Sequence, residues 1–185
     1  MLAETIKNRR AIYPDAYNQE PISKTEVTQV LEAANWAPTH RRTEPWRFKV
    51  FHSEDSRNKL STFLGEAYER SVDKPSAFKR KKMEQKAIQS GCAIAICMQR
   101  DPEESIPEWE EVASVAMAVQ NMWLTAQSLK IGAYWSSPKL IAFFGEHTPL
   151  AEGERCLGFF YMGKYHGELP QGTRKSTISE KTQWL

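Results

Sequence analysis

Two adjacent arginines near the start of the chain are the first residues whose type and spacing could do chemistry. Arg9 and Arg10 lie in the segment NRRA, and paired guanidinium groups form charge-assisted, bidentate hydrogen bonds with phosphate oxygens. The segment could therefore hold an anionic ligand. The same residues could also form the solvated end of a short helix, and the local sequence taken alone favours that simpler interpretation.

A stiff loop between residues 37 and 46, with the sequence APTHRRTEPW, is the second candidate. Two prolines restrict its backbone, and a rigid loop between a helix and a strand can present hydrogen-bond donors at fixed positions. An ordinary surface loop that Trp46 anchors to the core is an equally well supported interpretation. The residues that could line a ligand are Pro38, Thr39, His40 and Arg42.

Two further turns carry polar side chains. The segment GAYWSSP follows the longest apolar helical pattern, and its Trp135, Ser136 and Ser137 suit a flat ligand with polar edges. The same residues would also suit a core strand that ends in a turn. Near the C-terminus, the turn GTRK contains Arg174, which could bind an anion or simply face solvent.

Other catalytic classes find little support. The sequence has no G-x-S-x-G, H-E-x-x-H, Walker or G-x-G-x-x-G motif, and its four histidines lack metal-ligand spacing. We therefore expect no metal site and no hydrolase or P-loop chemistry. Three cysteines without C-x-x-C spacing argue against a disulfide framework. Because the chain also lacks a secretory signal at its start and any apolar run long enough to span a bilayer, we expect a cytoplasmic protein without a membrane anchor.

Nucleic-acid binding is a class that the charge balance disfavours. Lys and Arg total 25 against 23 Asp and Glu, and a net charge of +2 gives no general attraction to a polyanion. The basic run of residues 79–82 lies in a helical stretch beside Glu84 and lacks aromatic stacking partners nearby. A solvated helix face is the better interpretation of that run.

The elements that must position these candidates are those of one α+β domain spanning residues 1–185. A capping box at Ser23 and Glu26 predicts the start of a helix that Pro38 ends. Further helices are expected at residues 5–10, 54–70, 77–90 and 108–130, the last one capped by Gly132, and strands at 46–51, 92–98 and 156–165. A polar tail follows, and it is either free or laid across another subunit with Trp184 and Leu185 as its anchor.

Taken in order, these segments resemble the FMN-dependent nitroreductase family. The pattern runs from the Arg-Arg pair through PIS, AANWAP and EPWRF to the Ala-rich VAMAVQNMWLTAQSLKIGAYW, and closes with a strand and an Arg-Lys turn. The likeness covers residues 6–175 and is greatest to the small, minimal branch of the family, where APTHRRTEPW replaces the commoner Ser/Asn-containing loop. Each motif is weak alone, whereas the ordered set is specific.

The resemblance implies a central, mostly antiparallel sheet flanked by helices, in an intertwined homodimer with FMN at the subunit interface. It implies that Arg9 and Arg10 hold the FMN phosphate and ribityl chain, with Arg174 in a second phosphate-binding turn. Ala11 stands where the family usually has serine, so one hydroxyl contact is missing. The tail, from about residue 166 to residue 185, would pack on the partner subunit.

The same resemblance implies two contacts with the flavin ring. One is a loop that reaches the flavin from the partner subunit and contains Pro38, Thr39, His40 and Arg42. The other is a flavin-contacting turn formed by Trp135, Ser136 and Ser137.

The implied activity is ping-pong transfer of a hydride from NAD(P)H through FMN to a nitroaromatic, a quinone or a similar flat acceptor. The flavin carries the chemistry, with no catalytic side chain, and Arg10 is the first candidate for stabilising charge at N1 and O2 of the reduced ring. The alternatives are a specialised family member, such as a dehalogenase or an enoyl- or diketopiperazine-type oxidoreductase, and a non-catalytic FMN-binding protein. We expect a small-molecule acceptor, and neither nucleic acid nor membrane as a partner.

Overall fold

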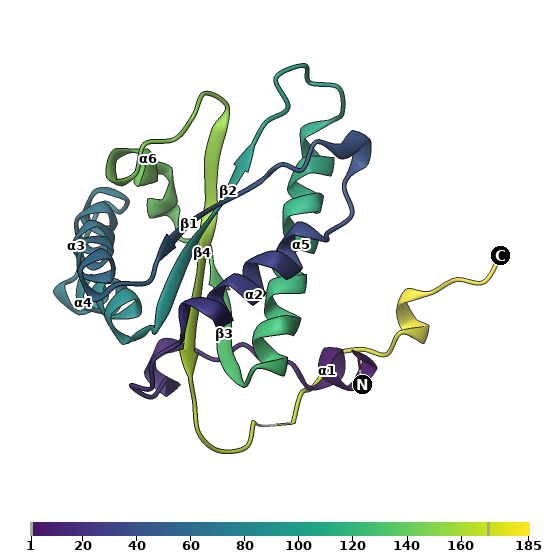
Figure 1. The fold of residues 1–185 in the computed structure, drawn as a ribbon, viewed down its shortest axis with the longest axis horizontal. Helices are drawn as coiled ribbons and strands as arrows, with labels where there is room; N and C mark the ends of the chain where they lie inside the picture. The colour runs from purple at the N-terminus through teal and green to yellow at the C-terminus, as the bar shows by residue number, and fades with distance from the viewer. Residues whose placement is uncertain (1, 170) are drawn as a thin grey trace.

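The computed structural model describes residues 2–169 and 171–185 (Figure 1). Its longer elements are five helices and four strands, which follow one another as α1 (Leu2–Asn8), α2 (Lys24–Asn35), β1 (Trp46–Phe51), α3 (Glu54–Arg70), α4 (Ala77–Gln89), β2 (Cys92–Gln99), α5 (Glu108–Ser128), β3 (Ile131–Ser136) and β4 (Glu154–Lys164). Short helical turns lie between them: η1 (Pro14–Ala16), η2 (His40–Arg42), η3 (Lys139–Phe143), α6 (Phe144–His147) and η4 (Ser179–Lys181).

The strands form one antiparallel sheet in the order β1-β2-β4-β3. The expected α+β class with a central, mostly antiparallel sheet is therefore confirmed. Side chains alternate between the two faces of a strand, and on β2 the residues of both faces are buried. A sheet of this kind must be covered by helices on both sides.

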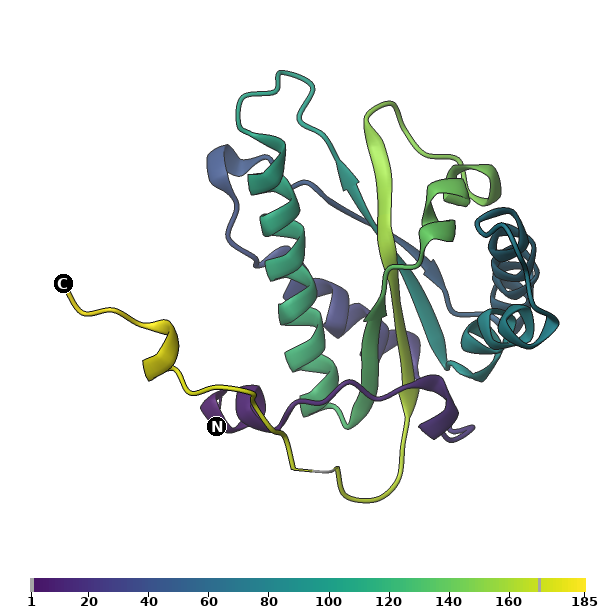
Figure 2. The ribbon, with the colours of Figure 1, turned by 180° about the vertical axis from the view of Figure 1, so that it is seen from behind.

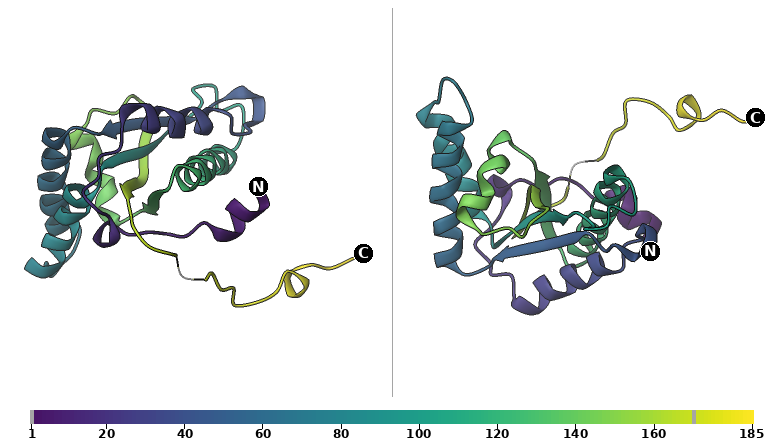
Figure 3. Two further views of the ribbon diagram at one scale, coloured as in Figure 1. Left: turned by 60° about the horizontal axis from the view of Figure 1, so that its bottom comes forward. Right: turned by 90° about the horizontal axis from the view of Figure 1, so that it is seen from above.

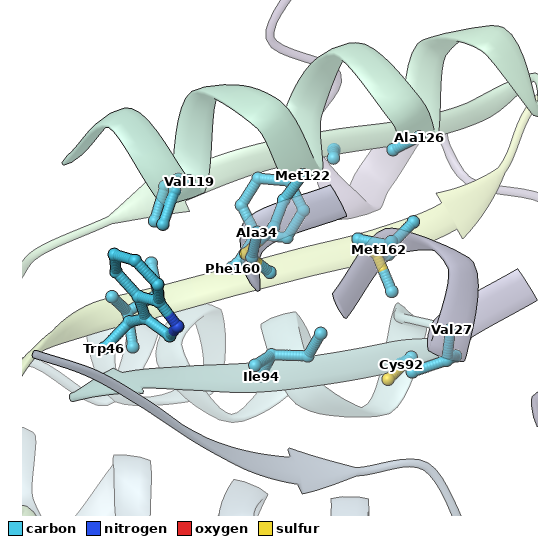
Figure 4. Close-up of a cluster of buried hydrophobic side chains, with 14 of the residues drawn as sticks. Val27, Ala34, Trp46, Cys92, Ile94, Val119, Met122, Ala126, Phe160 and Met162 are labelled. Atoms are coloured by element: carbon cyan, nitrogen blue, oxygen red, sulfur yellow. The ribbon is translucent and has the colours of Figure 1, made fainter. Parts of the chain in front are cut away.

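Helices cover both faces (Figures 1 and 3). On one side, Ile94 and Ile96 pack with residues of α2 and α5, such as Val30 and Met122, in the cluster that Figure 4 shows in part. On the other side, the alternate residues of β2 pack against α3, α4 and α6. Burying both faces fixes the strand register, because a slip by one residue would exchange the two faces.

Serine side chains cap the starts of three helices. At the start of α2, the Ser23 hydroxyl accepts the Glu26 N–H while the Glu26 carboxylate accepts the Ser23 N–H, which confirms the predicted capping box. Serine side chains also cap α3 and α4, through Ser53 and Ser76. The predicted bounds of α3 are confirmed, and those of α4 differ by one residue.

Two predictions about helix ends were wrong. The first helix ends at Asn8, so Arg9 and Arg10 lie just beyond it rather than inside it. Gly132 does not cap α5, because Lys130 takes the left-handed conformation there at φ 55° and Gly132 already lies in β3. The glycine is instead required by close packing, since a Cβ at position 132 would meet Ile12 at 3.0 Å and Tyr165 at 3.1 Å.

The C-terminal tail extends away from the body of the protein (Figures 2 and 3). Its apolar side chains Ile178, Trp184 and Leu185 are 77%, 93% and 111% exposed. Among the described residues, no helix is both long enough and apolar enough to cross a bilayer.

Candidate functional site

Arg9 lies on the surface of α5 at the end where the chain turns into β3. Its guanidinium carbon is 4.3 Å from the centroid of the Trp123 ring, and Trp123 in turn packs edge-on against Phe160 of β4 at 5.8 Å. A guanidinium over an indole face is held by a cation–π interaction. The core thus fixes the tryptophan, and the tryptophan fixes Arg9.

The other two predicted anion-binding arginines lie close to Arg9. Burial is the largest cause that lowers the pKa of Arg9, followed by the charges of Arg174 and Arg10. The guanidinium of Arg10 lies against Gly172, where an added Cβ would come within 2.5 Å of its central carbon. The structure therefore brings together three arginines from the two ends of the chain.

Two of these cations, Arg9 and Arg174, are not neutralised by ion pairs within the described part of the chain. Within residues 2–169 and 171–185, no ion pair joins Arg9 or Arg174 to a carboxylate. Arg174 uses its own side chain to donate to the neighbouring Thr173 carbonyl at 2.9 Å. Like charges held side by side repel one another, and a bound anion relieves that repulsion.

The segment after the arginines pairs with β3. Ala11 forms a parallel bridge with Ala133, and the Ile12 N–H donates to the Ala133 carbonyl at 3.1 Å. At about 3.3 Å per residue, Ser136 then lies roughly 10 Å farther along the strand. Ala11 therefore lies beside β3, whereas Trp135 and Ser136 lie farther along that strand, with Ser137 directly beyond its end.

Trp135 is held in place by an irregularity in β4. The register shifts between Ile96 and Cys97 of β2, where β4 carries an extra residue, and the Trp135 indole N–H donates to the Leu157 carbonyl at 3.3 Å. Gly158 has φ +147°, and a Cβ there would come within 2.3 Å of the indole nitrogen. A glycine is therefore required for the tryptophan to lie where it does.

A pocket of about 350 Å³ adjoins the same strand, and sequence reasoning missed it. It lies between α4, the segment at Tyr13 and β3, and its lining includes Tyr13, Lys82, Gln85, Lys86, Gln89 and Tyr134. Its volume is within the range of small-molecule sites. The pocket joins three segments that are distant in sequence, so no local pattern predicts it. The basic residues of α4 are the one sequence feature that is related to it.

Lys86 is the central cation of this pocket. Its ammonium group donates to the Ser136 hydroxyl at 3.4 Å and lies 5.9 Å from the centroid of the Tyr134 ring, which Tyr13 covers at 4.8 Å. Burial, and to a lesser degree the charge of Lys82, lowers the pKa of Lys86. Burial likewise raises the pKa of Tyr134 to about 12.

The predicted loop has an unusual backbone. Arg41, Arg42 and Glu44 all have positive φ, at 51°, 57° and 42°, and a non-glycine residue in this region costs roughly 1–2 kcal/mol. The Thr39 and Thr43 hydroxyls are 3.2 Å apart, and the loop is tied to α5 through His40 Nδ1, 2.6 Å from the Glu110 carboxylate. Strained backbone of this kind is often kept where a loop has a function.

This loop and the arginines lie at opposite ends of α5 (Figure 1). His40 contacts Glu110 in the first turn, whereas Arg9 lies on Trp123 near the last. At 1.5 Å per residue these two points of the helix are about 20 Å apart. Within one chain, Pro38, Thr39, His40 and Arg42 are therefore not brought to the arginine cluster. Among the described residues, no group of three or more His, Cys, Asp or Glu side chains could hold a metal ion.

Comparison with known proteins identifies the family to which these residues belong. The model of the nitroreductase family matches residues 6–164. The chain belongs to the nitroreductase family. The match begins just before the arginine pair and ends at the last residue of β4, so it covers the whole sheet of this nitroreductase.

Two proteins show how far the likeness extends. The Bacillus subtilis protein YfhC, provisionally named an NAD(P)H nitroreductase, is 28% identical over 98% of this chain and 92% of its own length. The crystal structure of a nitroreductase-like family protein from Bacillus cereus superposes with a TM-score of 0.87 at 26% identity, covering 100% of this chain and 96% of that one.

A third comparison concerns the fold. A provisionally assigned nitroreductase from Desulfovibrio desulfuricans, crystallised in complex with FMN, has a TM-score of 0.75 at 22% identity, covering 100% of this chain and 96% of that one.

Lys86 of this nitroreductase should release its proton at lower pH than an ordinary lysine, whose pKa is 10.5. Lys82→Gln should raise the pKa of Lys86 by removing a like charge, and Lys82→Arg should leave it unchanged. NMR titration of ¹³C-labelled lysine in the ligand-free protein measures both. Because the unfolded chain keeps that proton to higher pH, the group's contribution to stability should rise with pH between the lowered value and 10.5. A Lys86 resonance that titrates at 10.5 or above would contradict this account.

Proposed function

We propose that the chain is an FMN-dependent oxidoreductase that takes a hydride from NAD(P)H and delivers reducing equivalents to a nitroaromatic, a quinone or a similar flat acceptor. One observation carries the proposal: Arg9, Arg10 and Arg174 converge beside a strand that leads to a pocket with a half-buried cation. A ligand with an anionic group at one end and a flat polar ring at the other fits that arrangement. The provisional name of YfhC and the FMN in the Desulfovibrio desulfuricans structure support the choice.

The donor set fits FMN. Arg9, Arg10 and Arg174 would hold the phosphate, because guanidinium groups bind phosphate oxygens in pairs and these cations lie close together. Ala11 offers no hydroxyl group, so the phosphate end depends more heavily on the arginines. Trp135 and Ser136 would contact the ring, with Ser137 just beyond the end of the strand.

When bound, FMN supplies the redox chemistry by taking up and giving back a hydride. The side chains of this protein bind, orient and place charge. Lys86 is better placed than Arg10 to face the negative charge that develops on the ring, because the Arg10 guanidinium is bonded to the Lys7 and Arg9 carbonyls and lies against Gly172. A half-buried cation acts more strongly than a solvated one, since less water screens it.

The proposed reaction predicts a two-stage colour change. The purified protein, after addition of FMN, should be yellow, should lose that absorbance anaerobically on addition of NADH or NADPH, and should regain it when a nitroaromatic or a quinone is added. Stopped-flow absorbance with each nicotinamide measures the first stage. A colourless protein that takes up no FMN would exclude the proposal, and bound flavin that neither nicotinamide bleaches would indicate a non-catalytic flavin-binding protein.

Arg9→Ala should weaken FMN binding about 10- to 100-fold, because one charge-assisted contact contributes roughly 1.5–3 kcal/mol. Flavin fluorescence during dialysis gives the dissociation constant. The matched control is Arg70→Ala, since Arg70 also lies over an aromatic ring, Phe143 at 4.6 Å, but on α3. Equal flavin retention by the two variants would contradict the phosphate role of Arg9.

We also propose that the site is completed by a second copy of the chain. The exposed face of α5 carries Trp109, Ala116 and Met117, spaced as one stripe of a helix, and Trp109 is 69% exposed. A long helix that is apolar on a second face suits burial against an equal surface. Such pairing would bring the loop of residues 38–42 from one subunit to the arginines of the other, with the tail of residues 166–185 packed on the partner.

Mixed dimers test this arrangement directly. Arg9→Ala and Arg42→Asn chains each lack one half of the site, and asparagine tolerates the left-handed backbone at position 42. If the halves come from different subunits, unfolding and refolding the two variants together should restore about a quarter of all sites, because each mixed dimer contains one intact site. If both halves belong to one chain, mixing restores none. Bound flavin per chain, compared with each variant refolded alone, gives the answer.

A further inference from the structure

We propose that Cys97 and Cys156 form a dithiol pair that a hydroperoxide converts into an intramolecular disulfide. The proposal is independent of the proposed function, because neither cysteine belongs to the site described above. Both are free thiols inside the sheet, one on β2 and one on β4.

The two residues are direct partners in the β2–β4 ladder. Opposed residues of an antiparallel pair have Cα atoms roughly 4.5–5.5 Å apart, and disulfides span Cα separations of about 4.4–6.8 Å. The backbone therefore already holds the pair at a suitable separation.

The bulge in β4 places both side chains on the same face. Phe159 and Tyr161 point toward α3 and α4, so strict alternation would direct Leu157 to that side as well. Leu157 instead packs with the opposite cluster, and Cys156 returns to the α3 side, where Cys97 also lies. In a regular ladder, Leu157 would pair with Cys97, and Cys156 would lie on the opposite face of the sheet.

The surroundings distinguish this pair from the third cysteine. A hydrogen bond between the two thiols lowers the pKa of Cys156 and raises that of Cys97. Lys49 adds positive charge nearby, opposed by Glu154. Cys92 faces the other core, where burial raises its pKa to about 12. Cys156 is also 8% exposed, against 0% for the other two, so it is the thiol that an oxidant in solution reaches first.

The reaction balances in two steps. The Cys156 sulfur, as thiolate, attacks one oxygen of hydrogen peroxide; the O–O bond breaks, hydroxide leaves and takes the thiol proton as water, and Cys156 becomes a sulfenic acid. The Cys97 sulfur then attacks the Cys156 sulfur; the S–O bond breaks, and the leaving hydroxide takes the Cys97 proton as a second water. The two thiols lose two electrons in total, and the peroxide is reduced to two waters.

Thiol counting on the wild-type protein tests the proposal without any variant. The reduced, folded protein is treated with hydrogen peroxide, its thiols are then alkylated under denaturing conditions, and its peptides are mapped by mass spectrometry. The three free thiols should fall to one, with Cys92 alkylated and Cys97 joined to Cys156, and dithiothreitol should restore all three. Protein oxidised in denaturant is the control, because there the folded geometry no longer selects the partner.

Three results would overturn the proposal: three thiols that survive peroxide, a disulfide that includes Cys92 or joins two chains, or oxygenation of Cys156 to the sulfinic acid without a disulfide. Variants then assign the order of steps. Cys92→Ala should still form the bond. Cys97→Ala should leave a Cys156 sulfenic acid that dimedone traps, whereas Cys156→Ala should leave Cys97 unlabelled. Labelling of Cys97 in that last variant would contradict the assigned order.

Discussion

Repulsion among like charges is the constraint on which the proposed ligand site depends. The fold carries Arg9, Arg10 and Arg174 to one place although they come from the two ends of the chain, and no ion pair to a described carboxylate relieves Arg9 or Arg174. Arg80, by contrast, forms ion pairs with Glu69 and Glu84. Where no such ion pair is present, as at Arg9 and Arg174, a bound anion would lower the free energy of the charges.

The length of α5 determines what one chain can do alone. The helix separates the strained loop from the arginines, while its inner face packs on the sheet through residues such as Val119 and Met122. Its outer face is apolar at Trp109 and Met117. Pairing of two copies would explain why α5 both separates the two groups of residues and exposes a second apolar surface. The proposed oxidoreductase activity rests on that pairing and on membership of the family.

Local features of the fold could be predicted from sequence, and long-range ones could not. Capping at Ser23 and the bounds of α3 depend on residues within a few positions, so their patterns are visible in the chain. The sequence pattern places Gly132 at a helix end because glycine is common there, whereas Lys130 takes that conformation and packing against Ile12 requires the glycine. The arginine positions came from family resemblance. The pocket at Lys86 was missed because its walls come from three separate segments.

The attachment of the tail has a further consequence. Arg174 belongs to the tail, and its charge contributes to lowering the pKa of Arg9. The chain beyond Arg174 extends outward with exposed apolar side chains. An anion bound by the guanidinium groups of both Arg9 and Arg174 would also restrain the chain at the start of the outward-extending segment. If the proposed ligand orders the tail, a partner that holds the tail in the same arrangement must tighten ligand binding, and the ligand must tighten binding of that partner by the same factor. The rate at which a protease cleaves the last residues would then depend on the fraction of sites that are occupied by ligand.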